Sequence, residues 1–478
     1  MSDRLSLSAE LNRPYAPAST YDDEPIYAVL TLQPEAEAGS TQRAPLNLCL
    51  VVDSSATMYN FQLTDDEREY WMSLAISRNE MERGEADDRD AVYWSGQTLE
   101  EMEGTVRKPM SMAVQALKQL LRSIQHGDKA SVVVFADKTH TLFTDQDWEN
   151  DPEHCIGELD RLLEQRLPID IGMGTRMASS LDSASELLAH TATNQTVNRI
   201  IVISDGIVQD EPATMAAITR IEHEGYAITT LGVGDEFDEE FLMRVADNTR
   251  GAYYYAADIN EITDKLLTEL TVIQSTAIHQ VYVTASGIGD DIVKDVFMVQ
   301  PYMNIFEELE SGGGWVKARV GDLPSNMPTS LLIQIAPALH EQGDATIANV
   351  EIAWQEGDEE KSLSTSIAAK FTDKASLLGE RNAAIQDLVD RFTVFKFERE
   401  AQRAQEKGDM DLAREKLGAA TKELYKLGES ELATELEAQI KTLGDPDQDP
   451  SRLKRIKATT RRLGEKAPGS TRQLTPKA

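Results

Sequence analysis

The sequence predicts a doubly wound α/β domain inserted in a β-sandwich and followed by a helical bundle. Buried-strand runs alternate with helical spacing in one long region, short alternating strands flank it on both sides, and only helical patterns follow Asp373. We place the units at 1–45 for the amino-terminal sandwich strands, 46–274 for the α/β domain, 275–373 for the rest of the sandwich, 374–444 for the bundle and 445–478 for a basic, disordered tail.

The composition suits a large protein with substantial hydrophobic cores. Of 478 residues 41% are hydrophobic, and the formal net charge of -35 argues against nucleic acid as a partner of the main body. Only two cysteines, Cys49 and Cys155, are present, which makes no disulfide framework and fits a reducing compartment. We find no apolar run of membrane-spanning length and no signal-peptide core in residues 1–8, so we expect a cytoplasmic protein that contacts no membrane.

The two flanks of the α/β domain carry half-buried strands. Apolar and polar residues alternate over Leu5–Leu11 and again over Tyr27–Thr31. The strands expected after residue 275 are Gln280–Thr284, Ile292–Val299, Trp315–Val320, Leu331–Ile335, Thr346–Trp354 and Leu363–Ala369. We expect the two groups to pair in one sandwich. The alternative is that residues 1–45 form an edge hairpin on the α/β sheet.

The α/β domain begins with an almost unbroken apolar run, Leu46–Val52, that ends in Asp53-Ser54-Ser55-Ala56-Thr57. Such a run indicates a strand buried on both faces of a parallel sheet. Asp53, Ser55 and Thr57 leave its carboxyl end, where open α/β sheets bind ligands. Their hard oxygen atoms suit Mg²⁺. The alternative is a polar turn in which Asp or Ser caps a helix.

Two further turns carry oxygen ligands. Gly172-Met173-Gly174-Thr175 is a glycine-rich loop that ends in a hydroxyl, and the buried run Asn198–Ser204 ends in Asp205-Gly206. Together, the three turns resemble the metal-ion-dependent adhesion site of von Willebrand factor A (VWA) domains, with Asp53, Ser55, Thr57, Thr175 and Asp205 at its five positions in the expected order.

The resemblance implies a Rossmann-like α/β fold and a particular metal chemistry. Ser55 and Thr57 would bind Mg²⁺ directly, Asp53 and Asp205 largely through water, and Thr175 in some states; Ca²⁺ or Mn²⁺ could take the same place. An open coordination position would accept a Glu or Asp from a partner protein. The family usually has Ser-Gly-Ser where this chain has Ser55-Ala56-Thr57, and alanine lacks the freedom of glycine at positive φ.

An inserted segment, residues 59–105, separates the metal loop from the next helix, which we expect to start at Pro109. The segment has its own helix signal, a capping box of Thr64 and Glu67. Because this segment directly follows the loop Asp53–Thr57, we expect it to lie at the same edge of the sheet as the metal. The segment is either a lid over the metal site that selects partners, or a packed structural insertion whose acidic residues simply face solvent.

The rest of the α/β domain alternates strand and helix. Strands are expected at Ala130–Ala136, Val197–Ser204 and Tyr226–Gly232, and helices at Pro212–Glu224, Glu239–Ala246 and Ile259–Leu270. Gly251–Ala256 is expected to be an edge strand whose three tyrosines divide between core and surface.

The carboxyl-terminal region predicts a bundle of three helices and a basic tail. Apolar stripes recur within Leu377–Glu406, Ala413–Leu427 and Leu432–Leu443. From Ser451 onward the tail has nine Lys or Arg residues and one acid, Glu465. We expect it to contact the body, an acidic partner or a neighbouring subunit, which would give self-association. The alternative is a solubilising tail without a further role.

Three functional hypotheses follow. The first is a non-enzymatic, metal-dependent protein-interaction module with no catalytic residue and no organic cofactor. The second is a structural scaffold or regulatory subunit whose helical and tail segments bind partners such as an AAA+ ATPase or a kinase. The third is a metal-assisted phosphohydrolase, which lacks a D-x-D pair after Asp53 and a lysine or histidine in the three loops.

Overall fold

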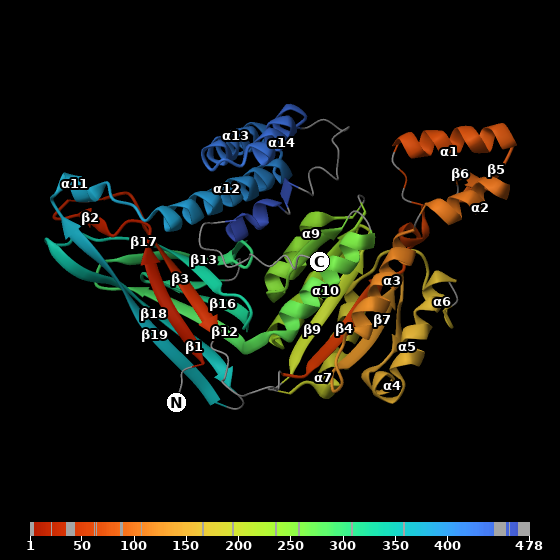
Figure 1. Ribbon diagram of the computed structural model, residues 1–478, viewed down its shortest axis with the longest axis horizontal. Coiled ribbons are helices and arrows are strands. Elements are labelled where there is room, and N and C mark those ends of the chain that lie inside the picture. Colours follow the sequence, from red (N-terminus) through yellow and green to blue (C-terminus); the bar gives the residue numbers. More distant parts are fainter. Residues whose placement is uncertain are drawn as a thin grey trace, which may run out of the picture.

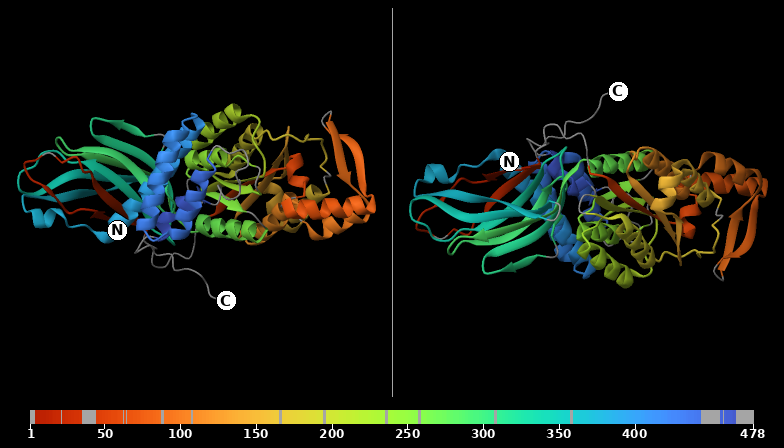
Figure 2. Two further views of the ribbon diagram at one scale, coloured as in Figure 1. Left: turned by 90° about the horizontal axis from the view of Figure 1, so that it is seen from above. Right: turned by 90° about the horizontal axis from the view of Figure 1, so that it is seen from below.

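The computed structural model describes residues 4–20, 22–34, 44–61, 63, 65–86, 89–106, 108–164, 167–193, 196–234, 237–256, 259–306, 309–356, 359–443, 456–457 and 459–466. The molecule is elongated, with the sandwich at one end and the α/β domain beside it (Figures 1 and 2). The bundle lies over the junction between the two.

The α/β domain is a six-stranded sheet with helices on both faces, as predicted. The strand order is β11-β10-β9-β4-β7-β8, and only β8 runs antiparallel to its neighbour. The strands are β4 Leu46–Asp53, β7 Lys129–Phe135, β8 Thr139–Phe143, β9 Val197–Ser204, β10 Ala227–Val233 and β11 Tyr253–Ala256. Every residue of β4 is buried, which agrees with its central place.

The helices of this domain are η1 Ala56–Tyr59, α3 Pro109–Arg122, α4 Asp145–Asn150, α5 Pro152–Glu158, α6 Asp160–Leu163, α7 Ala178–Thr191, α8 Glu211–His223, α9 Glu239–Thr249 and α10 Ile259–Gln274. Side chains of α3 and α10 share a core with one face of the sheet, and those of α7, α8 and α9 share a core with the other. Helix α3 begins at Pro109, as expected from its preset φ.

The prediction for the tyrosines of β11 is wrong in one respect. Tyr254 and its neighbours do point to opposite faces, since Tyr254 belongs to one core and Tyr253 and Tyr255 to the other. All three are nevertheless buried, because α10 covers one face of this strand and α9 the other.

The strands before and after the α/β domain form one sandwich, which confirms the predicted fold class. One sheet has the order β1-β3-β17-β13-β14 and the other β15-β16-β12-β18-β19-β2. Strand β3 pairs with β1 on one side and β17 on the other, with Leu30 opposite Leu331. The alternative, an edge hairpin on the α/β sheet, is therefore wrong.

The sandwich strands are β1 Leu5–Leu11, β2 Tyr15–Pro17, β3 Ile26–Pro34, β12 Thr276–Gly287, β13 Ile292–Gln300, β14 Asn304–Ile305, β15 Glu310–Gly312, β16 Trp315–Pro324, β17 Thr329–Ala336, β18 Gly343–Glu356 and β19 Glu359–Thr372. Their inward side chains form one shared core.

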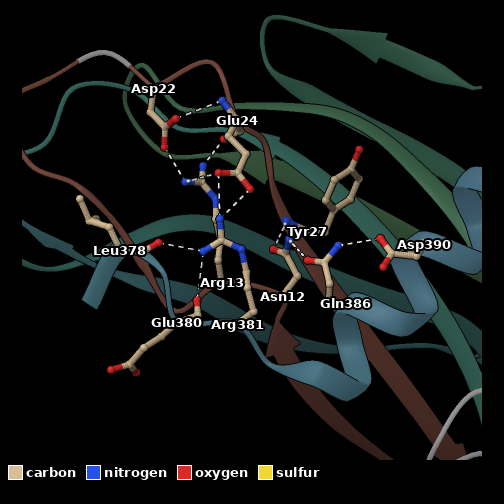
Figure 3. A network of polar contacts seen from close by, with 10 residues as sticks. All are labelled: Asn12, Arg13, Asp22, Glu24, Tyr27, Leu378, Glu380, Arg381, Gln386 and Asp390. Carbon is tan, nitrogen blue, oxygen red and sulfur yellow. Dashed lines mark hydrogen bonds and ion pairs between the residues drawn. The ribbon is translucent and has the colours of Figure 1, made fainter. Parts of the chain in front are cut away.

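The helical region comprises α11 Ala375–Leu378, α12 Ala383–Glu406, α13 Met410–Lys426 and α14 Ser430–Lys441. Its apolar side chains pack against the outer face of the β3–β17–β13 sheet in a common core. Figure 3 shows polar contacts that join the start of α12 to the amino-terminal strands: Arg381 pairs with Glu24 at 2.9 Å, and Asn12 Nδ2 donates to Gln386 Oε1 at 3.3 Å. Arg13, only 3% exposed, pairs with Asp22 in the same network.

The prediction that residues 445–478 are disordered is wrong for residues 456–457 and 459–466. The other residues of that range lie outside the described part of the chain. A short 3-10 helix, η2, spans Leu463–Lys466. Ile456 and Leu463 are buried in the bundle core, and Arg461 pairs with Asp247 of α9. These residues contact the body of the protein, which was one of the expectations for the basic tail, and the acids that neutralise them come from a distant part of the sequence.

The inserted segment forms a small unit of its own: α1 Asp65–Arg78, β5 Met81–Ala86, β6 Arg89–Trp94 and α2 Gly96–Thr105. Trp71, Ala75 and Met102 are buried, and Arg78 pairs with Glu101 at 3.0 Å. The unit projects from the end of the α/β domain that is furthest from the sandwich (Figures 1 and 2). The predicted cap residue Thr64 lies outside the described residues.

A membrane-spanning segment was not expected from the sequence. Across the described ranges, each helix is too short or too polar to cross a bilayer.

Candidate metal centre

Three loops meet at the carboxyl edge of the α/β sheet. Asp53 is the last residue of β4, and Asp205 directly follows β9. These strands are parallel neighbours, with Val52 beside Ile203, so their ends lie together. The third loop, which carries Thr175, is joined to the first because Ala56 N donates to Met173 O at 3.0 Å.

The structure brings all five predicted residues together. Thr57 Oγ1 donates to Asp205 Oδ1 at 2.8 Å, and the hydroxyls of Ser55 and Thr57 are 3.0 Å apart. A methyl group added at Gly206 would lie 3.0 Å from Thr175 Oγ1 and 3.5 Å from Asp53 Oδ2, which places these two oxygens around the same point. The result is a cluster of three hydroxyls and two carboxylates.

The two carboxylates are buried, with Asp53 fully inaccessible and Asp205 4% exposed. Burial raises the pKa of Asp53, although hydrogen bonds from the Ser204 hydroxyl and from Ser55 act in the opposite direction. A buried carboxylate is costly unless its charge is compensated. Hard oxygen atoms around two such groups are the ligands that a divalent cation prefers, so the residues present fit a Mg²⁺-type ion.

The loop with Thr175 is fixed by a carboxylate that sequence reasoning missed. Asp137 Oδ2 accepts hydrogen bonds from the backbone N–H groups of Met173 at 3.0 Å and Gly174 at 3.2 Å, and these bonds lower the pKa of Asp137. Gly172 has φ of +82°, and a Cβ there would lie 2.1 Å from Asp137 Oδ2. The available signal was the position of Asp137 just after a buried strand at the same edge of the sheet.

A second missed residue is Ser204. Its hydroxyl donates to Asp53 Oδ2 at 2.5 Å and thereby holds this carboxylate between β4 and β9. Its signal was its place beside Asp205 at the end of the strand. Ala56, where the family usually has glycine, is not among the described residues with positive φ, so the alanine introduces no backbone strain.

The loops of the cluster expose apolar side chains beside the charged side chains of Asp137 and Arg176. Met173 is 73% exposed and Ile207 64% exposed, and they flank Thr175 and Asp205 in their respective loops. Thr57 is half-buried. Among the described residues, at this cluster as elsewhere, His, Cys, Asp and Glu side chains do not gather in groups of three or more that could hold a metal, and the cluster relies on hydroxyls besides its two carboxylates.

Family models match two parts of this chain. Residues 103–269 match the family model of the von Willebrand factor type A domain, and residues 383–466 match the Sll0103-like, C-terminal alpha-helical domain. The chain therefore contains a VWA domain and a Sll0103-like helical domain. The first match begins at residue 103, near the end of the insertion, so it does not include Asp53, Ser55 and Thr57. The second match includes η2.

Relatives agree with this assignment. A von Willebrand factor A domain-containing protein of Dictyostelium discoideum, DDB_G0292028, is 20% identical over 197 residues, which cover 41% of this chain and 20% of that protein. This chain thus spans about a fifth of the length of that relative.

Two solved structures share the fold over almost the whole chain. A von Willebrand factor type A protein from Catenulispora acidiphila superposes with a TM-score of 0.70 at 14% identity, covering 96% of each chain. The ArnB paralog VWA2 from Sulfolobus acidocaldarius gives a TM-score of 0.53 at 12% identity, covering 97% of this chain and 99% of that one.

Proposed function

We propose that this protein is a non-enzymatic docking module that binds an acidic residue of a partner protein through a divalent cation, with Mg²⁺ as the expected ion and Ca²⁺ or Mn²⁺ as substitutes. The observation that carries the proposal is the convergence of Asp53, Ser55, Thr57, Thr175 and Asp205 at one edge of the sheet. VWA domains are generally interaction modules, which favours docking over phosphohydrolase chemistry. We place this activity in the cytoplasm because both cysteines are buried free thiols.

Hydrogen bonds support the roles proposed for Thr57 and Asp53. Because the Thr57 hydroxyl donates its proton to Asp205, its lone pairs remain available to the ion. Ser204 and the Ser55 N–H orient the carboxylate of Asp53, which suits a ligand that acts through water. The bound ion supplies a Lewis-acidic contact for an incoming carboxylate. With few protein carboxylates around it, the ion keeps enough positive charge to attract one more.

The exposed side chains beside the cluster add a requirement on the partner. Met173 and Ile207 are exposed apolar residues of the two loops that carry Thr175 and Asp205. A partner carboxylate flanked by apolar side chains would bury that surface while it reaches the ion. A highly charged acidic segment would gain less and would be repelled by the net charge of -35.

Affinity capture from the native cells tests the proposal. Wild-type protein should retain partners in Mg²⁺ and release them on addition of a chelator, whereas Asp205→Ala should retain none. Asp182→Ala removes a 45% exposed carboxylate of α7 and serves as the matched control. Equal capture by Asp205→Ala and wild type would instead favour the scaffold hypothesis, in which helical or tail segments bind the partners.

We propose that the insertion limits access to the ion. Replacing residues 62–103 with a short Gly/Ser loop should preserve the fold, since α1 and α2 pack mainly on each other and the ends are close: Lys108 Nζ lies 4.6 Å from the ring centroid of Phe61. Partner binding should become stronger or broader, measured by the same capture and by titration of a captured partner. Lost partner binding with intact metal binding would make the insertion part of the docking surface.

A further inference from the structure

The loop that carries Thr175 is held by a carboxylate on each side. We propose that Asp137 and Asp210 are positioning residues, which fix this loop through its backbone before an ion binds and so set the affinity of the metal site. Asp137 follows β7 and Asp210 follows β9, the two strands on either side of the central β4. The inference rests on the metal-dependent docking proposed above and adds two residues outside the five proposed ligands.

Asp137 holds the part of the loop before Thr175. Its Oδ2 atom accepts the N–H groups of Met173 at 3.0 Å and Gly174 at 3.2 Å. The approach is close, because a Cβ at Gly174 would lie 2.3 Å from Asp137 Oδ1. Any side chain at this position would therefore displace the carboxylate from the backbone that it holds.

Asp210 holds the part of the loop after Thr175. It occupies the N-cap position of α8, where an aspartate usually accepts a hydrogen bond from its own helix, but its side chain makes no cap bond there. Instead, its Oδ1 accepts from Met177 N at 2.9 Å and its Oδ2 from Ala178 N at 3.2 Å, at the start of α7. Thr214 Oγ1 also donates to Oδ1 at 3.1 Å, which orients the carboxylate. Asp210 thus caps α7, whose own N-cap residue Met177 offers no side-chain bond.

The backbone between these two ends is bonded to both other loops of the cluster. Ala56 N donates to Met173 O at 3.0 Å, and Gln209 N donates to Thr175 O at 2.8 Å. The Thr175 hydroxyl faces the loop of Asp205, since a Cβ at Gly206 would lie 3.0 Å from its Oγ1. A loop that is already held at these points loses little conformational freedom when an ion binds, so less ordering entropy opposes binding.

Loss of either carboxylate should weaken the metal site through the loop. Asp137→Ala leaves the N–H groups of Met173 and Gly174 without this acceptor, and Asp210→Ala does the same at the start of α7. Residues that orient the ligands of a metal typically contribute about 10–100-fold to its affinity. We therefore expect each substitution to weaken Mg²⁺ binding by about 10–100-fold.

The two conservative variants should differ from each other. Asp137 accepts both N–H groups on one oxygen, and an asparagine keeps one carbonyl oxygen, so Asp137→Asn should bind Mg²⁺ about as tightly as wild type. Asp210 uses both of its oxygens, so Asp210→Asn loses one bond and should have an affinity between those of wild type and Asp210→Ala. A general loss of stability would not distinguish the two positions in this way.

Calorimetric titration of Mg²⁺ into the full chain measures these affinities. If Asp137 acts through Thr175, adding Asp137→Ala to Thr175→Ala should weaken binding no further than Thr175→Ala alone. Gly174→Ala should weaken binding as Asp137→Ala does, because it displaces the same carboxylate. Asp238→Ala is the matched control, since it removes the aspartate that caps α9 in the same domain, and it should bind as wild type does.

Hydrogen exchange in excess chelator examines the loop without any ion. Asp137→Ala should accelerate exchange in the peptide that covers residues 172–178 by about tenfold or more, because two backbone N–H groups lose their acceptor. Asp238→Ala should leave this peptide unchanged. The measurement does not depend on metal affinity, so it separates the role of the two carboxylates from the docking function.

Three results would overturn the inference while leaving the metal site in place. The first is wild-type Mg²⁺ affinity in both Asp137→Ala and Asp210→Ala. The second is a further loss of affinity when Asp137→Ala is added to Thr175→Ala, because the carboxylate would then act independently of that loop. The third is unchanged exchange of residues 172–178 in Asp137→Ala. A wild-type protein that binds no Mg²⁺ would instead contradict the docking function itself. If Asp210→Ala does not fold, Asp137→Ala and Gly174→Ala still decide.

Discussion

Titration of Mg²⁺ into Asp53→Ala should give no calorimetric signal of binding, whereas the wild-type protein should bind one ion. Asp53 is fully buried, and its carboxylate accepts hydrogen bonds from the Ser204 hydroxyl and the Ser55 N–H. The Asp53→Ala substitution removes one of the two carboxylates of the cluster. It also leaves the Ser204 hydroxyl and the Ser55 N–H without the carboxylate that accepts their hydrogen bonds. Asp182→Ala on the surface of α7 should bind as wild type does. Equal binding by Asp53→Ala would show that the cluster is not the metal site.

Thermal unfolding gives an independent reading of the same site. Since burial raises the pKa of Asp53, its ionised form costs stability in the metal-free protein as pH rises above the usual range of an aspartate. A bound cation reverses that cost, so Mg²⁺ should raise the melting temperature of wild type at neutral pH but not that of Asp53→Ala. Ser204→Ala, which only loosens the carboxylate, should weaken Mg²⁺ binding by about 10–100-fold without abolishing it.

The predictable part of the site is the part built from strand ends. The apolar run of β4 ends at Asp53 and that of β9 is followed by Asp205. Because the two strands are parallel neighbours, their carboxyl ends lie side by side. Asp53 and Asp205 could therefore be paired without coordinates. Ser204 and Asp137 could not be assigned, because a serine inside a strand and an aspartate after one have many ordinary roles, and only the fold shows which group each contacts.

The contacts of residues 456–457 and 459–466 show a second limit of prediction from the sequence. Lys457 and Arg461 have a basic local context that resembles a solvated tail, and nothing in that context points to Glu239 or Asp247. The pairing depends on where the bundle places the chain after α14. Strand β11 is an edge strand, but Tyr255 is buried because helix α9 packs on that face of the strand, a contact that the strand's own pattern does not reveal.

Deleting residues 1–40 should remove the cooperative unfolding transition of the sandwich and leave that of the VWA domain in place. Strand β3 lies inside its sheet, between β1 and β17, and its side chains point alternately to two cores. Ile26, Leu30 and Leu32 belong to the sandwich core, whereas Val29 packs in the core shared with the bundle. Loss of three such buried side chains alone costs about 5 kcal/mol or more, which exceeds a large part of the stability of a typical domain.

Differential scanning calorimetry of the deletion and of two point variants measures this effect. Leu30→Ala should destabilise the sandwich by about 2–5 kcal/mol because it opens a cavity at a fully buried position. Thr31→Ala on the adjacent, half-buried position should change stability by about 0.5 kcal/mol or less. The bundle should unfold earlier in the deletion, since its core uses the same strand. An unchanged sandwich transition after deletion would mean that β3 contributes nothing to this sheet, and the insertion of the VWA domain between its strands would have to be abandoned.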